Sequence, residues 1–296
     1  MENAVNGFDL PVALGRAALP STSLDARFAV DVAGDSLANV TGTAQVVADR
    51  SVIDGVRVFG ARAALRFGGG RVAVDSARVE SVAGELVARG ALGLTPAVSD
   101  TLRFAFTADS LGGLRRYLAR RGTAEADSLV GSVRASGVLT GRTSRFAFDA
   151  AVDGAELRLR TATARTVRGT VALSALPDSA TGAMTLRFDA LRTGSTAFTE
   201  AALRADLLGG WQARTTAAFV APSGVTARAV ADVRRLSDTT VVRLDSLQAR
   251  TSGNSWASQR RTVVAIDRQG FRFDSLVLAG ERGGRIAASG RASAGD

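Results

Sequence analysis

Residues 102–107 read Leu-Arg-Phe-Ala-Phe-Thr, and this stretch decides the fold. Leu102, Phe104 and Phe106 fall on one face of an extended chain, and Arg103 falls on the other. Successive side chains of a β-strand point to opposite faces, so such alternation predicts a strand with one apolar face and one solvated face.

The same two-residue period recurs from about residue 25 to residue 291. In each stretch an apolar set faces one way, and the residues between are mostly Arg, Asp or Glu. The apolar sets include Phe28, Val30 and Val32; Phe146, Phe148 and Val152; Leu157 and Leu159; Leu203, Ala205 and Leu207; and Trp211, Ala213 and Phe219. Small and polar residues separate these stretches at intervals of about 8–12 residues, which is typical of antiparallel meanders. The sequence therefore predicts an all-β chain.

The number of strands constrains how the sheet is built. We expect roughly eighteen strands, whereas twisted open sheets rarely exceed about ten without curling or splitting. We therefore expect an elongated antiparallel repeat sheet that curls into an apolar groove, the arrangement known as a repeating β-groove or β-taco. Alternation alone does not separate such a groove from a filled core.

Helical spacing is clear in one place only. Leu111, Leu114 and Leu118 lie at i, i+3 and i+7, and Ser110 or Asp109 is placed to cap the first turn. We expect one short helix near residues 110–121. The expected organisation is one continuous elongated module, a fragment of a longer protein, with β-groove repeats over 1–109, the helix insertion over 110–122 and further β-groove repeats over 123–296.

A weak internal repeat is carried by the triplet Asp-Ser-Leu. It begins at Asp35, Asp109, Asp127, Asp245 and Asp274, and residues 72–76 and 186–191 are variants of the same pattern. In residues 271–278 the apolar phase slips at Asp274-Ser275. Because Asp and Ser side chains hydrogen-bond readily to nearby backbone groups, we expect a bend or bulge in the strand at these points.

Composition excludes several kinds of chemistry. The chain has no Cys, no His and no Lys, so all 37 basic residues are Arg. Disulfides, thiol nucleophiles, soft metal sites and Ser-His-Asp triads are therefore excluded. The net charge is +9, but Arg is scattered singly among Asp and Glu, whereas nucleic-acid binding needs basic residues gathered on one face. We expect a non-enzymatic protein with no cofactor, no metal and no nucleic-acid partner.

Three local features are better explained by structure than by function. Residues 253–257, Gly-Asn-Ser-Trp-Ala, nearly match a nucleophile elbow but lack the final Gly, and no His is present to act as the base. Trp211 and Trp256 could line a ligand site, although a single Trp is more often a packing residue. A cluster of arginines could contact lipid headgroups or form an ordinary solvated helix face. Its members are Arg115, Arg116, Arg120 and Arg121.

The last third of the chain resembles a known family. Residues 241–292 run from a strand through Asp-Ser-Leu and a segment with Trp256 to a second strand, then to Phe-Arg-Phe-Asp-Ser-Leu-Val-Leu at 271–278. The stretch finishes on Gly-Gly-Arg-Ile-Ala-Ala-Ser-Gly-Arg at 283–291. Residues 108–159 are similar in texture, with a Leu-spaced helix before Leu-Val-Gly-Ser-Val-Arg-Ala-Ser-Gly-Val-Leu-Thr-Gly at 129–141. This pattern resembles the repeat of the AsmA-like family, which includes the translocation-and-assembly-module subunit TamB.

The resemblance implies a function and a location. AsmA-like proteins are anchored in the inner membrane, cross the periplasm of a diderm bacterium and are implicated in phospholipid transport to the outer membrane. It therefore implies a periplasmic chain, attached to the inner membrane through a segment absent here. The implied partners are phospholipid acyl chains, the two membranes at the missing ends and an outer-membrane barrel protein.

The leading hypothesis is a lipid-binding groove segment that conducts phospholipids between the inner and outer membranes and supports outer-membrane assembly. Two alternatives stay open: a structural, adhesin-like β-solenoid with a filled core, and a scaffold for assembly of outer-membrane proteins. The residues expected in the groove are Phe28, Val30, Phe67, Phe104, Phe106, Phe146, Phe148, Leu157, Leu159, Phe188, Leu203, Phe219, Phe271 and Phe273.

Overall fold

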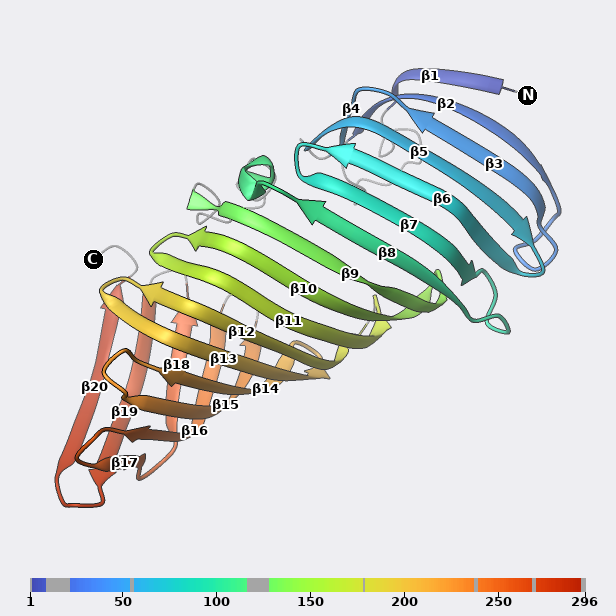
Figure 1. Cartoon of the computed structure of the whole chain (residues 1–296). Helices are drawn as coiled ribbons and strands as arrows, with labels where there is room; N and C mark the ends of the chain where they lie inside the picture. The colour runs from blue at the N-terminus through green and yellow to red at the C-terminus, as the bar shows by residue number, and fades with distance from the viewer. Residues whose placement is uncertain are drawn as a thin grey trace. The chain divides into compact units, whose positions relative to one another are not determined.

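The structure is a computed structural model that describes residues 2–8, 22–53, 56–115, 128–177, 179–236, 239–267 and 270–293. The described residues form an all-β protein with twenty strands and a single turn of 3₁₀ helix (Figure 1). The chain divides into two compact units, residues 1–166 and 167–296. Strand β11 (Ala162–Leu176) crosses the boundary.

The first unit is an antiparallel meander in which strands that follow one another along the chain also pair (Figure 1). Its strands are β1 (Glu2–Phe8), β2 (Thr22–Ala33), β3 (Thr41–Ala48), β4 (Ser51–Ile53), β5 (Val56–Gly68), β6 (Arg71–Ser81), β7 (Gly84–Gly93), β8 (Asp100–Ala108), β9 (Val130–Arg142) and β10 (Arg145–Leu159). The pairing of neighbouring strands through short turns confirms the antiparallel meander predicted from the punctuated alternation.

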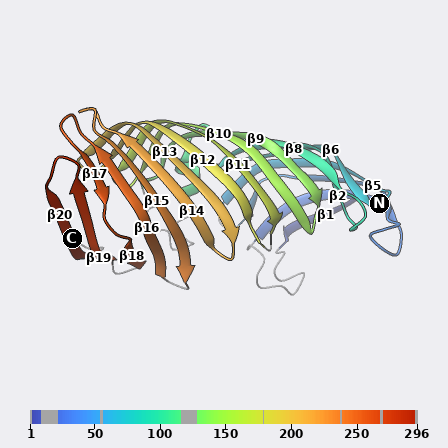
Figure 2. The same cartoon turned by 90° about the horizontal axis from the view of Figure 1, so that it is seen from below.

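The second unit repeats this arrangement, and Figure 2 shows its strands from below. Its remaining strands are β12 (Thr181–Thr193), β13 (Thr196–Gly209), β14 (Gln212–Val220), β15 (Thr226–Leu236), β16 (Thr239–Arg250), β17 (Ser255–Ser258), β18 (Thr262–Asp267), β19 (Gly270–Gly280) and β20 (Arg285–Ser293). From β12 to β20 the described strands pair antiparallel.

Two pairs of short strands are halves of interrupted strands. β17 and β18 both pair with β16 on one side and with β19 on the other, and residues 259–261 separate them. In the same way β3 and β4 both lie between β2 and β5. Each pair therefore occupies one position in its sheet, with a local irregularity where the ladder is interrupted.

The bulges expected at Asp-Ser are present at three sites. The register of β5 with β6 and of β6 with β7 shifts at Asp75-Ser76. The register of β15 with β16 shifts at Asp245, and that of β19 with β20 shifts at Asp274-Ser275. At Asp274 the carboxylate accepts hydrogen bonds from the backbone N–H groups of Ser275 (2.6 Å) and Val263 (3.0 Å). The side chain thus satisfies backbone groups that the bulge removes from the ladder.

The other copies of the triplet have other roles. Asp35 and Ser36 lie in the turn after β2, where Asn39 accepts hydrogen bonds from both of their backbone N–H groups. Ser110 caps the 3₁₀ turn that follows Asp109. At the variant Asp189-Ala190 the register of β12 with β13 is unchanged, although Ala190 has a φ of +50°. Asp127 lies outside the described residues.

The predicted helix near 110–121 is corrected over its described part to a short 3₁₀ turn, η1 (Leu111–Leu114). Ser110 caps it as expected, because its Oγ accepts a hydrogen bond from the N–H of Gly112 at 3.3 Å. Gly112 and Gly113 occupy half of this turn, and each glycine in a helix costs about 1 kcal/mol relative to alanine. Residues 116–127, with Leu118, Arg116, Arg120 and Arg121, lie outside the described residues.

Candidate functional site

The register of the first unit aligns apolar residues into rows that cross β2, β3 and β5–β10. One row is Val30, Ala44, Leu65, Val74, Gly90, Leu102, Leu139 and Phe148. The next is Phe28, Val46, Ala63, Ala77, Ala88, Phe104, Gly137 and Ala150. We call the side of the sheet that carries these rows the apolar face. Because every described residue in both rows is apolar or Gly, the face is continuous across eight strands.

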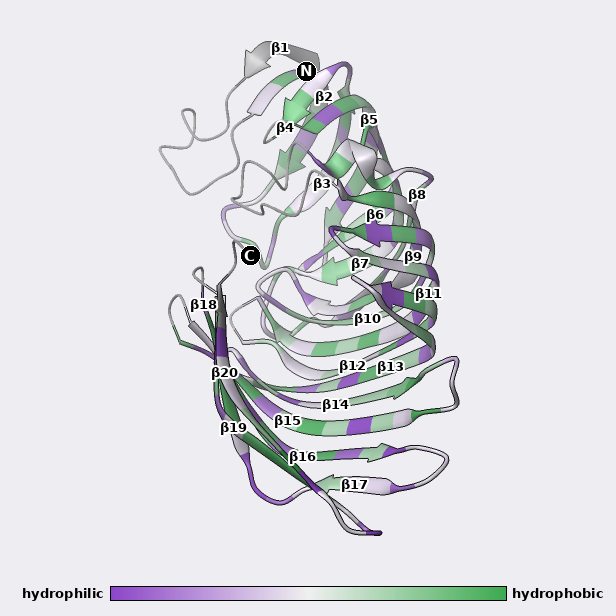
Figure 3. Ribbon diagram, turned by 90° about the vertical axis from the view of Figure 1, so that its left-hand side faces the viewer, coloured by the Kyte–Doolittle hydropathy of each residue, from purple (hydrophilic) through white to green (hydrophobic). Residues whose placement is uncertain are grey.

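The second unit has an equivalent face. One row is Gly182, Leu207, Ala213, Val233, Val242, Val264, Phe273 and Gly290. Another is Phe188, Ala201, Phe219, Ala227, Ala249, Trp256 and Gly280. Figure 3 shows hydrophobic and hydrophilic segments alternating along β12 to β16, as a strand with two different faces requires. Trp256 therefore belongs to the apolar face.

Twelve of the fourteen residues expected in the groove lie in or directly beside these rows. They are Phe28, Val30, Phe67, Phe104, Phe106, Phe146, Phe148, Phe188, Leu203, Phe219, Phe271 and Phe273. Leu157 reaches the same face beyond a bulge in β10, since its methyl groups lie against Gly131 and Gly154. Leu159 lies one residue beyond the last residue of β10 that pairs with β9, and it is 45% exposed.

Trp211 is not part of an alternating strand, so that prediction is wrong. It lies with Gly210 in the two-residue turn between β13 and β14, has a φ of +60° and is 79% exposed. Phe198 was missed: its ring lies 5.0 Å from that of Phe219, on the apolar face. Near Asp189-Ala190 the positions that face the apolar side shift by one residue in β12 and in β13 alike. The alternation within a single strand does not reveal such a shared shift.

The described residues leave much of the apolar face of each unit exposed. Among the described residues the buried apolar side chains are nearly all Ala and Val, and the largest side chain below 2% exposure is that of Thr262. Several large apolar residues of the face remain well exposed, such as Val30 at 45% and Phe271 at 45%. A filled core would bury Leu and Phe completely. Most of the larger apolar side chains of the described face are instead only partly buried.

The opposite side of each sheet, which we call the polar face, carries ion pairs between neighbouring strands or along one strand. Arg66 binds Asp75 with an Nη2–Oδ1 distance of 2.6 Å, and Arg204 binds Asp206 at 2.8 Å. The hydrogen bond from Arg66 holds the pKa of Asp75 below its usual value, and Arg204 does the same for the pKa of Asp206. Such exposed pairs contribute little to stability. They keep the polar face charged and solvated.

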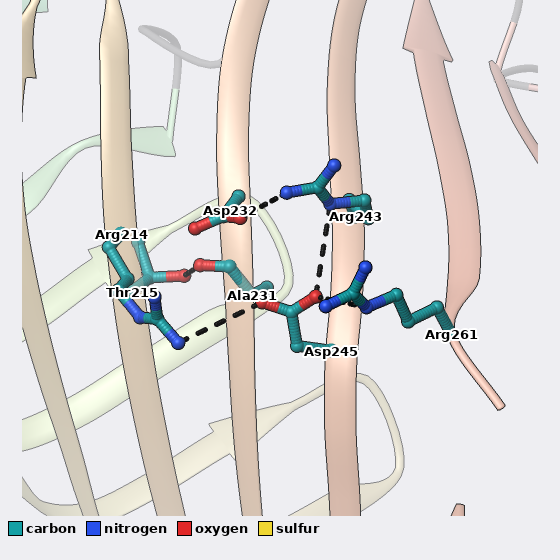
Figure 4. Close-up of polar contacts among 7 residues, drawn as sticks. All are labelled: Arg214, Thr215, Ala231, Asp232, Arg243, Asp245 and Arg261. Carbon is teal, nitrogen blue, oxygen red and sulfur yellow. Dashed lines mark hydrogen bonds and ion pairs between the residues drawn. The ribbon is translucent and has the colours of Figure 1, made fainter. Parts of the chain in front are cut away.

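Asp245 is the centre of the densest polar cluster among the described residues, shown in Figure 4. The bulge in β16 adds this carboxylate to the polar face, where Arg261 lies 3.1 Å away, Arg243 3.8 Å and Arg214 3.9 Å. Arg243 also binds Asp232 at 2.7 Å. The side chain of Asp245 is only 16% exposed, so its ion pairs are less screened than those of the exposed pairs. The cluster joins β14, β15, β16 and the interruption before β18.

A hollow of about 550 Å³ lies on the apolar face of the second unit. Leu207, Ala213 and Val233, which form one row across β13, β14 and β15, line it. Trp211 and Arg235 also line it, and the guanidinium carbon of Arg235 lies 5.8 Å from the centre of the Trp211 ring. Volumes of this size are typical of small-molecule and lipid sites.

Comparison of the chain with family models, with curated proteins and with solved structures finds no match. The described residues include no helix that is both long and apolar enough to cross a membrane. In the same described segments, no group of three or more Asp or Glu side chains is arranged to hold a metal ion. The apolar face is the candidate functional site.

Proposed function

We propose that this chain is a lipid-binding segment whose apolar face curls into a groove and carries phospholipid acyl chains between the inner and outer membranes, in support of outer-membrane assembly. One observation carries the proposal: apolar residues stay in register across eight strands of the first unit, and the larger ones are not buried there. A large exposed apolar surface marks an interaction site.

The chemistry of an acyl chain fits such a surface. Seven spacings between strands of about 4.8 Å each extend the rows roughly 34 Å along the sheet of the first unit. Each CH₂ group that leaves water for this surface contributes about 0.8 kcal/mol. Because the rows have the same apolar character from strand to strand, a chain can slide from one strand to the next without losing its burial. Headgroups stay in water at the open side.

The rows have a further property that suits this role. Small and large residues are mixed on the face: Gly137 and Ala150 follow Phe104 along one row, and Leu139 and Phe148 lie beside them in the neighbouring row. This leaves shallow depressions between aromatic and aliphatic side chains, into which a flexible chain can pack. No group of defined geometry is needed, and no chemical step is part of the proposal.

Strand direction supports this function over the alternative of a filled-core solenoid. The rungs of a β-solenoid stack in parallel. Among the described residues, the pairings are antiparallel apart from the single pair Gly93 and Arg142. The described residues also include no fully buried Leu or Phe side chain of the kind that fills a core. A role in assembling outer-membrane proteins would use the same apolar face for unfolded strands, and the following experiment separates the two ligands.

Photo-crosslinking at two adjacent positions tests the proposal. A photo-reactive amino acid replaces Phe146, on the apolar face, or Ala147, on the polar face, with the chain expressed in the periplasm of a diderm bacterium. We expect phospholipid adducts at position 146 and none at position 147, as measured by mass spectrometry. Adducts to protein alone at position 146 would favour the assembly scaffold. Equal lipid capture at both positions, or none at either, would contradict the groove.

A further inference from the structure

The positive charge of the chain is divided unevenly between the two units. Residues 167–296 contain 17 Arg and 11 Asp or Glu, a net charge of +6, whereas residues 1–166 contain 20 Arg and 17 Asp or Glu, a net charge of +3. The two rows that define the apolar face of the second unit contain no charged residue. The excess charge of this unit is therefore to be sought on its polar face.

Many arginines of this polar face have no partner. Eight of them make neither an ion pair nor a side-chain hydrogen bond with any described residue, and among the described carboxylates of the unit only those of Glu200 and Glu281 are in the same position. Opposite charges that pair largely cancel at a distance, so the unpaired arginines set the sign of the field. They are Arg187, Arg192, Arg228, Arg234, Arg250, Arg272, Arg285 and Arg291.

Three of these arginines share one row that crosses the second unit from β12 to β20. Arg187 and Arg285 lie at its two ends and Arg228 lies between them, and all three are exposed. Along the sequence these residues are far apart, and strand pairing alone brings them into line. The other members of the row are neutral: Ala202, Ala218, Gln248, Ala257 and Ala279.

Carboxylates on the same face reduce this charge without cancelling it. Asp189 and Glu200 lie opposite each other in the adjacent row, which also contains Arg250, and Glu281 follows near its end. Adjacent rows of one face are about 7 Å apart, which is within the screening length of about 8 Å at physiological salt. A large partner therefore meets the sum of the charges, and that sum is +6 when every residue of the unit is counted.

The spacing of the row indicates which kind of anionic partner fits. Three strand spacings separate Arg187 from Arg228, about 14 Å, and four separate Arg228 from Arg285, about 19 Å. Duplex DNA presents one charge per about 1.7 Å, and single-stranded nucleic acids stack on aromatic residues, which this row lacks. Protein interfaces usually have a large buried anchor, and the row offers none. Widely spaced cations suit a fluid layer of headgroups, in which anionic lipids can move to each guanidinium.

We infer that the polar face of the second unit binds the surface of a membrane that contains anionic lipids, with the guanidinium groups of Arg187, Arg228 and Arg285 against lipid phosphates. Charge complementarity selects this partner, because each arginine close to an anionic lipid surface raises the partition coefficient about fivefold. The inference goes beyond the proposed function: acyl chains lie on the apolar face, whereas this contact uses the other side of the sheet.

Sedimentation of the whole chain with vesicles tests the inference. One set of vesicles is phosphatidylcholine alone, and the other contains about one-third phosphatidylglycerol. At about 0.05 M NaCl we expect at least about tenfold tighter binding to the anionic vesicles, and at about 0.5 M NaCl we expect this preference to be lost through screening. Absence of binding to anionic vesicles at low salt would overturn the inference, as would tighter binding to a duplex DNA fragment than to those vesicles.

A triple variant locates the contact. Replacing Arg187, Arg228 and Arg285 together with Gln should lower partitioning into anionic vesicles by about tenfold or more. Because these side chains are exposed and make no contact with a charged partner among the described residues, the variant should keep the fold, which circular dichroism checks.

A matched control removes the same charge from the other unit. Arg62, Arg103 and Arg134 lie on the polar face of the first unit, and their joint replacement with Gln should change partitioning by less than about threefold. Equal losses in the two triple variants would show that only total charge matters, and would overturn the assignment to the second unit.

The membrane contact and the lipid groove fail separately. Equal binding of the wild type to neutral and anionic vesicles would overturn the membrane contact and leave the groove possible. Phospholipid adducts at position 146 should persist when Arg187, Arg228 and Arg285 are replaced. If those adducts are missing in the wild type while anionic vesicles still bind, the groove fails and the membrane contact stands.

Discussion

The rings of Phe104 and Phe148 stack at a centroid distance of 5.4 Å and an interplanar angle of 16°, although β9 runs between their strands. The contact is possible because the residue of β9 opposite Phe104 is Gly137. With no side chain at this position, the two rings meet over the backbone of the middle strand. The two rings therefore belong to neighbouring rows of the apolar face: Phe104 is opposite Gly137, and Phe148 is opposite Leu139, two residues further along β9.

Gly137 itself is closely packed, and its replacement tests the packing of β9 on β10. A Cβ at this position would lie 2.0 Å from the carbonyl oxygen of Asp149 and 2.8 Å from Cα of Ala150. We expect Gly137→Ala to lower the free energy of unfolding by about 1–3 kcal/mol, because the strands must separate. Gly68→Ala is the control, since nothing lies within 4 Å of its Cβ. Equal urea midpoints for the two variants would contradict the register of β9 with β10.

The cluster at Asp245 should matter more than an exposed ion pair. In Asp245→Asn three arginines lose the carboxylate they share, and we expect the free energy of unfolding to fall by about 1–3 kcal/mol. Asp49→Asn, which breaks the exposed pair of Arg27 and Asp49, should have little effect on the same urea titration. A larger loss in Asp49→Asn than in Asp245→Asn would show that the cluster does not hold the bulge of β16.

Asp274 predicts a dependence of stability on pH. The N–H groups of Ser275 and then Val263 hold its pKa below the usual 3.8, because they bind the charged form. A carboxyl group whose pKa is lower in the folded state stabilises the protein fully above the unfolded pKa, and this contribution is lost as the pH falls through the folded pKa. We expect Asp274→Asn to be less stable than the wild type at pH 6.

The difference between wild type and Asp274→Asn should therefore shrink below about pH 4. Denaturant midpoints measured from pH 6 to pH 2 give this comparison, with Asp31→Asn on the polar face of β2 as the control for lost charge. A difference that stays constant across this range would mean that ionisation of Asp274 is not what stabilises the bulge.

Lipid binding should depend on the face of the sheet on which a charge is placed. Leu203 lies half-buried on the apolar face between Leu186 and Ala217, and its neighbour Ala202 is exposed on the polar face. Leu203→Asp should greatly reduce the phospholipid recovered with the purified chain, because a carboxylate on the sliding surface is costly to desolvate. Ala202→Asp should retain it. Circular dichroism confirms that both variants fold, and equal lipid recovery would count against the proposed function.

Much of the fold could be predicted from the sequence because one rule dominates it. Alternation with a period of two depends on strand geometry alone, so it placed Phe104, Phe106 and Phe148 on one face of their unit. The bulges at Asp245 and Asp274 were also predictable, because an Asp-Ser pair interrupts the apolar phase and supplies its own hydrogen-bonding groups.

The remainder depends on local backbone choices that alternation does not describe. Trp211 fits the period of the following strand, yet Gly209 and Gly210 favour a turn that includes it. The leucines at 111 and 114 have helical spacing, but Gly112 and Gly113 lie between them, and the described segment is a 3₁₀ turn. The position of Phe198 depends on a phase change shared by two strands, which appears only once the strands are paired.

A face without large buried side chains also affects how the protein responds to temperature. The heat capacity increase on unfolding, about 12–15 cal/mol/K per residue in ordinary globular proteins, comes mainly from apolar surface that becomes hydrated. Here Val30, Phe271 and other large residues are already hydrated in the folded state. The increase per residue should therefore be smaller, and the stability curve of the empty chain flatter, with weaker cold destabilisation than a globular protein of this length would show.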